Sequence, residues 1–221
     1  MTTPHDTTEG EGRTDVSRRP PPAAIVIIGL LLIVAVIFVA SSLRRPRPLT
    51  WYPVSVVDPQ EVGDRLVGPS IYTVDGRGTE FTFFDFSTGS VVDSPDPLGW
   101  DLAFRRFTIL VNGGPDFAGQ GGILDLGITS LDSLTRVPTS GYAGNTPGRE
   151  VSNAATTQWY EYSWTSHVLS PKLNVFAVRT ADRRYAVFQI LSYYCPTAQA
   201  GCTTIWYRYQ GAGGTVFDPD G

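Results

Sequence analysis

A single apolar segment near the N-terminus limits what this chain can become. Every residue from Ala23 to Ala40 is apolar, and the next three residues extend the run without adding charge. A helix that crosses the ~30 Å hydrocarbon core of a bilayer needs roughly 20 such residues. Residues 23–43 are therefore predicted to form one transmembrane helix in contact with the lipid bilayer.

A cleaved signal peptide is the alternative interpretation of this segment. The apolar region of a signal peptide is usually about 7–15 residues long, and the run here is longer. The small residues Ala40 and Ser42 give only a weak indication of a cleavage site. No cysteine lies near the end of the run, so a bacterial lipoprotein anchor is not available. The sequence favours an uncleaved anchor.

The two cysteines decide the predicted orientation. Arginines precede and follow the apolar run in equal number, so the positive-inside rule favours neither orientation. Cys195 and Cys202 lie between two strand-like segments, and such a pair is typical of a disulfide, which requires an oxidising compartment. Two free thiols or half of a metal site are the alternatives, but no further Cys or His lies nearby. We expect a bacterial inner-membrane protein with a cytoplasmic N-terminus and a periplasmic C-terminal domain.

Composition divides the rest of the chain and excludes one class of partner. Residues 1–22 are rich in Thr, Glu, Gly and Pro and are predicted to be a disordered cytoplasmic tail. Residues 44–50 form a predicted linker, and residues 51–221 the extracytoplasmic domain. From Leu49 onward the chain has 17 acidic and 11 basic side chains. Such a surface repels phosphate backbones, so nucleic acid is not an expected partner.

Strand-like segments dominate the chain after the apolar run. Turn-forming residues at 75–78 and 181–183 predict two hairpins, and no apolar period of helical length follows Leu43. The fold class predicted is all-β, an antiparallel β-sandwich preceded by one N-terminal transmembrane helix. The predicted strands are residues 52–57, 70–74, 80–86, 100–111, 122–126, 174–180, 184–194 and 203–209.

Two long loops interrupt these strands. Residues 113–122 and 138–154 are rich in Gly, Pro and Ser and are longer than hairpins need. Long loops in compact domains are either functional or mobile. They are candidate contact surfaces, with a tolerated insertion as the alternative.

Several motifs in the second half of the chain resemble those of one protein family. The motifs are residues 99–107 (GWDLAFRRF), 111–114 (VNGG), 159–160 (WY), 166–171 (SHVLSP), 175–182 (VFAVRTAD) and 184–194 (RYAVFQILSYY). Together they cover roughly residues 100–209 with gaps, and they resemble the HmuY-like haem-binding proteins. The resemblance implies an HmuY-like all-β domain of the kind found in Bacteroidetes haemophores, which hold haem between β-fingers with paired axial side chains.

The chain departs from that family in its anchor and in its iron ligands. Well-known members are lipoproteins or released proteins, and their haem is typically gripped by two histidines, or by methionines in some relatives. This chain has only His5 and His167, and its single methionine is Met1. Because His5 is predicted to lie across the membrane, a pair of histidines or methionines within one domain is excluded.

His167, Tyr193 and Tyr194 are the candidate haem-binding residues that remain. The motif around His167 looks like the start of a strand in the family, which favours a structural role over ligation. Tyrosine can ligate haem, but tyrosines as frequent as these, Tyr207 included, are better explained by packing in a sheet. No other metal site is predicted.

Catalytic motifs are missing, so an enzyme is not expected. The chain has no Gly-x-Ser-x-Gly elbow, phosphate-binding loop, His-Glu-x-x-His or Cys-x-x-Cys. The acidic residues Asp85, Asp93, Asp96 and Asp101 match no calcium-loop spacing and are interpreted as solvated loop acids.

Two hypotheses follow. The favoured one is a non-enzymatic accessory subunit of a larger membrane protein complex, for which respiratory and photosynthetic complexes are candidate hosts, with no cofactor of its own. The alternative is a membrane-tethered haem-binding protein that holds haem through His167 alone or through dimerisation.

Overall fold

The computed structural model describes residues 21–43, 49–93 and 95–218. Residues 1–20 of the predicted tail and residues 44–48 of the predicted linker lie outside these ranges. The chain divides into two compact units, of which the second comprises Pro48–Gly221. We call this second unit the β-domain.

The first unit contains the helix α1 (Pro22–Ser42), which has 21 residues. It begins with a proline, whose fixed φ suits the first helical position. Neither its first nor its last turn carries a charge that would complement the helix dipole, and none of its side chains is buried. By length and composition, α1 is the one helix among the described residues that could cross a membrane.

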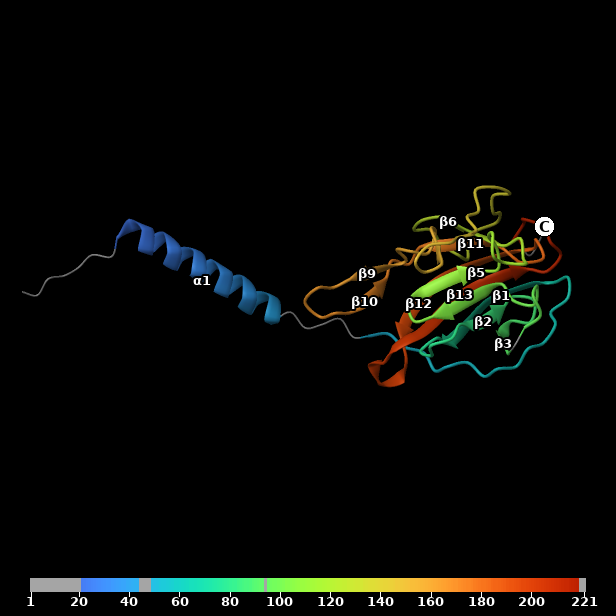
Figure 1. Cartoon of the computed structure of the whole chain (residues 1–221), viewed down its shortest axis with the longest axis horizontal. Helices are drawn as coiled ribbons and strands as arrows, with labels where there is room; N and C mark the ends of the chain where they lie inside the picture. Colours follow the sequence, from blue (N-terminus) through green and yellow to red (C-terminus); the bar gives the residue numbers. More distant parts are fainter. Residues whose placement is uncertain (1–20, 44–48, 94, 219–221) are drawn as a thin grey trace, which may run out of the picture. The chain divides into compact units, whose positions relative to one another are not determined.

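The β-domain is an antiparallel β-sandwich, as predicted (Figure 1). The larger sheet has five strands in the order β1 (Leu66–Asp75), β13 (Ala200–Gln210), β12 (Tyr185–Tyr194), β11 (Val175–Arg179) and β6 (Gly122–Asp125). The smaller sheet has four strands in the order β3 (Ser90–Val92), β2 (Thr82–Asp85), β4 (Leu102–Arg105) and β5 (Thr108–Val111).

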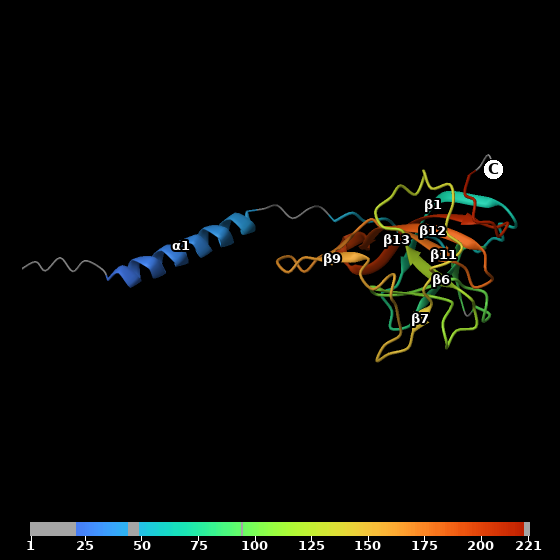
Figure 2. The same cartoon turned by 90° about the horizontal axis from the view of Figure 1, so that it is seen from above.

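Two short strand pairs lie outside these sheets. They are β7 (Asn145–Thr146) with β8 (Ser152–Asn153), and β9 (Tyr160–Tyr162) with β10 (Leu169–Pro171). The second pair projects from one end of the β-domain in both views (Figures 1 and 2). We call residues 160–171 the β9–β10 finger.

The main core lies between the two sheets. Successive side chains of a strand point to opposite faces, and Phe84 and Phe104 of the smaller sheet point inward, where both are fully buried. They meet inward-facing residues of the larger sheet in the same apolar cluster, including Phe188 and Tyr207. The rings of Phe84 and Tyr207 are 5.5 Å apart in an edge-to-face arrangement, a favoured geometry for aromatic pairs.

The other face of the larger sheet is covered by irregular chain. Leu131, Val137 and Phe217 pack on Ala177 and Val187 in a second apolar cluster. The buried guanidinium of Arg208 secures this cover by donating to the carbonyls of Leu131, Leu134 and Phe217. Both faces of the larger sheet are therefore buried.

Several strand predictions are confirmed. The hairpin around residues 181–183 is present, with Arg179 opposite Tyr185 at its closed end. The disulfide between Cys195 and Cys202 is also present, and it closes the connection from β12 to β13 around the short 3-10 helix η1 (Pro196–Ala198). Apart from η1, the described part of the β-domain contains no helix, as expected.

Three strand predictions are wrong. Residues 52–57 form no strand: Pro53 lacks a backbone donor, and the hydrogen bonds of the segment to β1 involve Ser55 and Val56. Residues 75–78 do not close a hairpin, because β1 pairs with β13 instead of β2. Residues 100–111 are not one strand but two, β4 and β5, which reverse at Arg106, where φ is 53°.

Candidate functional site

The smaller sheet is unusual in being apolar on its outer face. Phe83 on β2 lies opposite Ala103 on β4, which in turn lies opposite Leu110 on β5. These side chains point away from the main core and form a separate apolar cluster with Trp100. An antiparallel sheet commonly exposes polar side chains on one face, so this apolar row indicates a binding surface.

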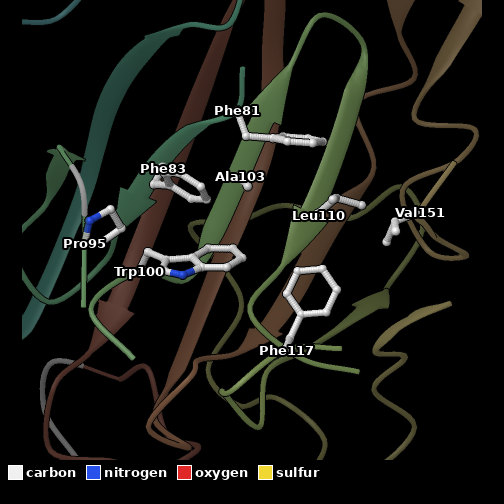
Figure 3. Close-up of a pocket in the computed structure, with 8 residues that line it drawn as sticks. All are labelled: Phe81, Phe83, Pro95, Trp100, Ala103, Leu110, Phe117 and Val151. Atoms are coloured by element: carbon white, nitrogen blue, oxygen red, sulfur yellow. The ribbon is translucent and has the colours of Figure 1, made fainter. Parts of the chain in front are cut away.

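A pocket of about 510 Å³ opens over this row (Figure 3). The sheet supplies its floor, and three loops supply its walls. Both long loops singled out in the sequence contribute a side chain, Phe117 from residues 113–122 and Val151 from residues 138–154. The lining residues are Phe81, Phe83, Pro95, Trp100, Ala103, Leu110, Phe117 and Val151.

The walls of the pocket are aromatic and stand at an angle to one another. The rings of Phe83 and Trp100 are 4.9 Å apart and tilted by 58°. The rings of Trp100 and Phe117 are 6.0 Å apart and tilted by 66°. None of the lining side chains is titratable. The pocket therefore offers flat apolar surfaces and no acid, base or nucleophile.

Charges of both signs lie just outside the pocket. The guanidinium of Arg105 stands 4.4 Å from the centroid of the Phe81 ring, a cation–π distance. On the other side, Phe81 and Phe83 also line a smaller hollow of about 280 Å³ that includes Asp93. The surroundings therefore favour neither an anion nor a cation.

Asn112 holds the walls of the pocket in place. Its side-chain amide donates to the carbonyls of Pro97 (2.9 Å) and Trp100 (3.0 Å). Its side-chain oxygen accepts a hydrogen bond from the backbone N–H of Gly119 at 3.0 Å. Asn112 is 1% exposed. One buried side chain thus fixes the segment before β4 to the loop that carries Phe117.

Glycines allow this loop to approach Asn112 closely. A Cβ at Gly119 would lie 2.4 Å from the backbone oxygen of Asn112, and a Cβ at Gly113 would lie 2.0 Å from that of Gly121. Any residue other than glycine at position 113 or 119 would place its Cβ too close to these backbone oxygens. The loop at 113–122 is therefore packed closely against the segment around Asn112.

Asp101 joins the two sheets. Its carboxylate accepts backbone N–H groups from Phe86 (3.0 Å) and from Ala181 (2.8 Å), which follow β2 and β11 respectively. It is 3% exposed. Burial, with the nearby negative charge of Asp85 as a second cause, raises the pKa of Asp101 well above its ordinary value. Asp101 is therefore a buried structural residue, which corrects its interpretation as a solvated loop acid.

His167 lies at the exposed tip of the β9–β10 finger. It occupies the turn between the strands with φ at 55°, and its backbone N–H donates to the carbonyl of Ser163 at 2.8 Å. Its Nδ1 is hydrogen-bonded to the hydroxyl of Tyr162. The exposed ring of Trp164 lies 5.1 Å from that of Tyr162. Sequence reasoning missed Tyr162 and Trp164, although they flank the same turn as His167.

The other two candidate residues lie in the protein interior. Tyr193 is 4% exposed and Tyr194 is 8% exposed. The hydroxyl of Tyr194 accepts the backbone N–H of Leu169 at 2.9 Å, which ties the finger to β12. Burial raises the pKa of Tyr193. The hydrogen bonds of the described residues join His167 to Tyr162 and not to either of these two.

A haem held by two histidines or two methionines does not fit the described part of the chain. His167 is the only histidine or methionine within the described ranges. Those ranges also contain no group of three or more His, Cys, Asp or Glu that could hold a metal ion. The roles of His167, Tyr193 and Tyr194 as haem ligands stay predictions.

Comparison with known proteins supports the resemblance inferred from sequence. The model of the HmuY protein family matches residues 78–147. That range includes the smaller sheet, Asn112 and every pocket residue except Val151. A search of curated proteins gives no match.

Solved structures show that the β-domain has the HmuY-like fold. A lipoprotein-like protein from Bacteroides fragilis is 18% identical, with a TM-score of 0.54 over 69% of this chain and 93% of its own. The apo HmuY analogue of Tannerella forsythia is 16% identical, with a TM-score of 0.54 over 68% of this chain and 99% of its own. A Bacteroides vulgatus protein described as an HmuY-like heme-binding protein is 18% identical, with a TM-score of 0.52 over 70% of this chain and 98% of its own.

Proposed function

We propose that this chain is a membrane-anchored, non-enzymatic accessory protein that belongs to a larger membrane complex. The observation that carries the proposal is α1, a 21-residue apolar helix that buries none of its side chains. A helix that is apolar on all sides requires apolar surroundings. A bilayer supplies them, and the helix then acts as an anchor for the β-domain.

The chemistry of the β-domain supports binding over catalysis. The pocket over the smaller sheet is lined by side chains that cannot transfer a proton or attack a substrate. The buried side chains of Asn112 and Asp101, which flank lining residues in sequence or support them, form hydrogen bonds with backbone groups. The HmuY-like fold is shared with proteins described as heme-binding or as lipoproteins.

The disulfide supports a location outside the cytoplasm. A bond between Cys195 and Cys202 persists in an oxidising compartment such as the bacterial periplasm. With α1 in the inner membrane and the N-terminus in the cytoplasm, the β-domain stands in the periplasm. There the anchor raises its effective concentration near other membrane proteins, and a respiratory or photosynthetic complex is a candidate host.

Purification from native membranes in a mild detergent tests the proposal. The mass of the particle and its absorption spectrum are measured on the same fraction. We expect a large, stable assembly without stoichiometric haem in this chain. A particle no larger than one or two copies of the chain would contradict the accessory-subunit proposal.

A second candidate function is haem binding at the β9–β10 finger. The observation that favours it is the exposed His167, whose Nδ1 is held by Tyr162 while Nε2 has no hydrogen-bond partner among the described residues. A hydrogen bond to one ring nitrogen orients the other for a ligand. One chain would then supply one axial side chain, and a dimer would supply two.

Haem titration of the purified full-length chain distinguishes this candidate. If it is correct, a Soret band appears at one haem per chain or per dimer and shifts in His167→Ala. His5→Ala is the matched control, because it removes the only other histidine, and it should leave the band unchanged. A spectrum that is identical in wild type and His167→Ala would reject the finger as the haem site.

A further inference from the structure

We propose that the pocket on the outer face of β2, β4 and β5 binds a neutral, flat, largely apolar small molecule, such as one with fused aromatic rings. This inference goes beyond the proposed function, because it needs neither the membrane anchor nor a partner complex. It rests on the lining, the ring geometry and the rigid support of the pocket.

The lining argues for a ligand without charge. All eight lining side chains are apolar apart from the indole N–H of Trp100. Moving a charged group from water into such surroundings costs several kcal/mol unless it finds a partner. Arg105 and Asp93 both lie near Phe81 and carry opposite charges. A charged ligand of either sign would therefore meet one attractive and one repulsive side chain.

The ring geometry argues for a flat ligand. Phe83, Trp100 and Phe117 are tilted against one another by 58° and 66°. A planar ring that stacks on one of them presents its face to the edge of the next, and both arrangements are favourable. A volume of about 510 Å³ lies within the range of roughly 300–1,000 Å³ typical of small-molecule sites.

The support argues for a pocket that exists before the ligand arrives. Asn112 fixes both the Trp100 segment and the Phe117 loop through three buried hydrogen bonds. The floor residues Ala103 and Leu110 are paired across neighbouring strands. A preformed site avoids the entropy cost of ordering loops on binding.

This site differs from the haem candidate. Its lining contains no His, Met, Cys or Tyr, so no lining side chain can ligate iron in the usual way. The finger, by contrast, offers His167 and Tyr162. Mutations in the pocket and on the finger can therefore be tested separately.

The test uses two fluorescent probes that differ by one charge. N-phenyl-1-naphthylamine is neutral and aromatic, and 1-anilinonaphthalene-8-sulfonate is the same ring system with a sulfonate added. Both are titrated into residues 48–221 with the disulfide formed. This fragment is a compact unit that contains the main apolar core. Circular dichroism and a cooperative thermal transition check its folding.

We expect saturable binding of the neutral probe and at least roughly tenfold weaker binding of the sulfonate, because the pocket cannot solvate the charge. Ala103→Phe fills the floor and should weaken the neutral probe by roughly tenfold or more. Phe117→Ala removes one wall and should weaken it by roughly two- to tenfold. The matched control is Phe107→Ala, since Phe107 is 50% exposed and is not a lining residue. It should bind like wild type.

Three results would overturn the proposal. The first is that the neutral probe does not bind saturably, and the second is that both probes bind with equal affinity. The third is that Phe117→Ala and a folded Ala103→Phe both bind the neutral probe with wild-type affinity. If Ala103→Phe does not fold, Phe117→Ala decides the matter alone.

Discussion

Replacing Asn112 by alanine tests the claim that one buried side chain holds the pocket together. The substitution removes two hydrogen bonds to the carbonyls of Pro97 and Trp100 and one from the N–H of Gly119. A typical internal hydrogen bond contributes about 0.5–1.5 kcal/mol net. Three bonds predict a loss of about 2–4 kcal/mol in the free energy of unfolding. For a domain of this size, that corresponds to a decrease in melting temperature of roughly 4–16 °C.

Urea denaturation of residues 48–221 measures the loss. Asn174→Ala is the matched control, because the Asn174 amide also donates two hydrogen bonds, but at the surface and to Asp125. Its loss should be within about 0.5 kcal/mol. Asn112→Asp keeps the acceptor for Gly119 and turns a negative charge toward two carbonyls, so it should cost at least as much as alanine. Equal stabilities of Asn112→Ala and Asn174→Ala would refute the reasoning, as would neutral-probe binding that survives in Asn112→Ala undiminished.

Two further predictions concern stability. The pKa of Asp101 is raised in the folded state, so protonation of Asp101 favours folding. This contribution to the free energy of unfolding is fully present below the unfolded pKa, about 3.9, and is lost as the pH rises through the folded pKa. Urea titrations at a series of pH values should therefore show the stability of wild type falling with pH relative to Asp101→Asn, and parallel profiles would contradict this. Replacing Cys195 and Cys202 together by alanine should cost about 2–3 kcal/mol, because the disulfide closes a short loop. If the double variant has the same urea midpoint as oxidised wild type, or if a reductant leaves the midpoint of wild type unchanged, the disulfide does not have that role.

Local signals were read correctly from the sequence. The apolar run predicts α1 almost to the residue, since the helix depends on a continuous run of apolar side chains that are neighbours in the chain. The turn at 181–183 predicts the β11–β12 hairpin, because the two strands are neighbours in the chain. Cys195 and Cys202 flank the short connection that contains η1, and their disulfide forms across it.

Pairing between strands that are far apart in the chain could not be predicted in the same way. The turn residues at 75–78 resemble those of a hairpin, yet Asp75 lies opposite Cys202. Turn residues determine the backbone conformation of only a few positions. The partner of β1 depends instead on how much apolar area it buries against strands more than a hundred residues away in the sequence. The reversal at Arg106 was missed because it uses a positive φ without a glycine.

The candidate site shows the same division. The sequence marked Trp100 and Asn112 as parts of family motifs and the loop at 113–122 as a candidate contact surface, and it marked His167 as the one histidine of the domain. It could not show that Asn112 supports a pocket or that Tyr162 contacts His167, because both depend on which side chains meet across turns and loops.

By itself, the sequence determined the apolar helix, the disulfide, the all-β class and the absence of catalytic motifs, because each depends on composition or on residues close in the chain. Only the tertiary structure decided that Phe83, Ala103 and Leu110 share the outer face of one sheet and that Phe117 and Val151 close over them. The physical reason is register. A shift of one residue between strands turns every side chain to the opposite face, so the pocket exists only once the strands have paired.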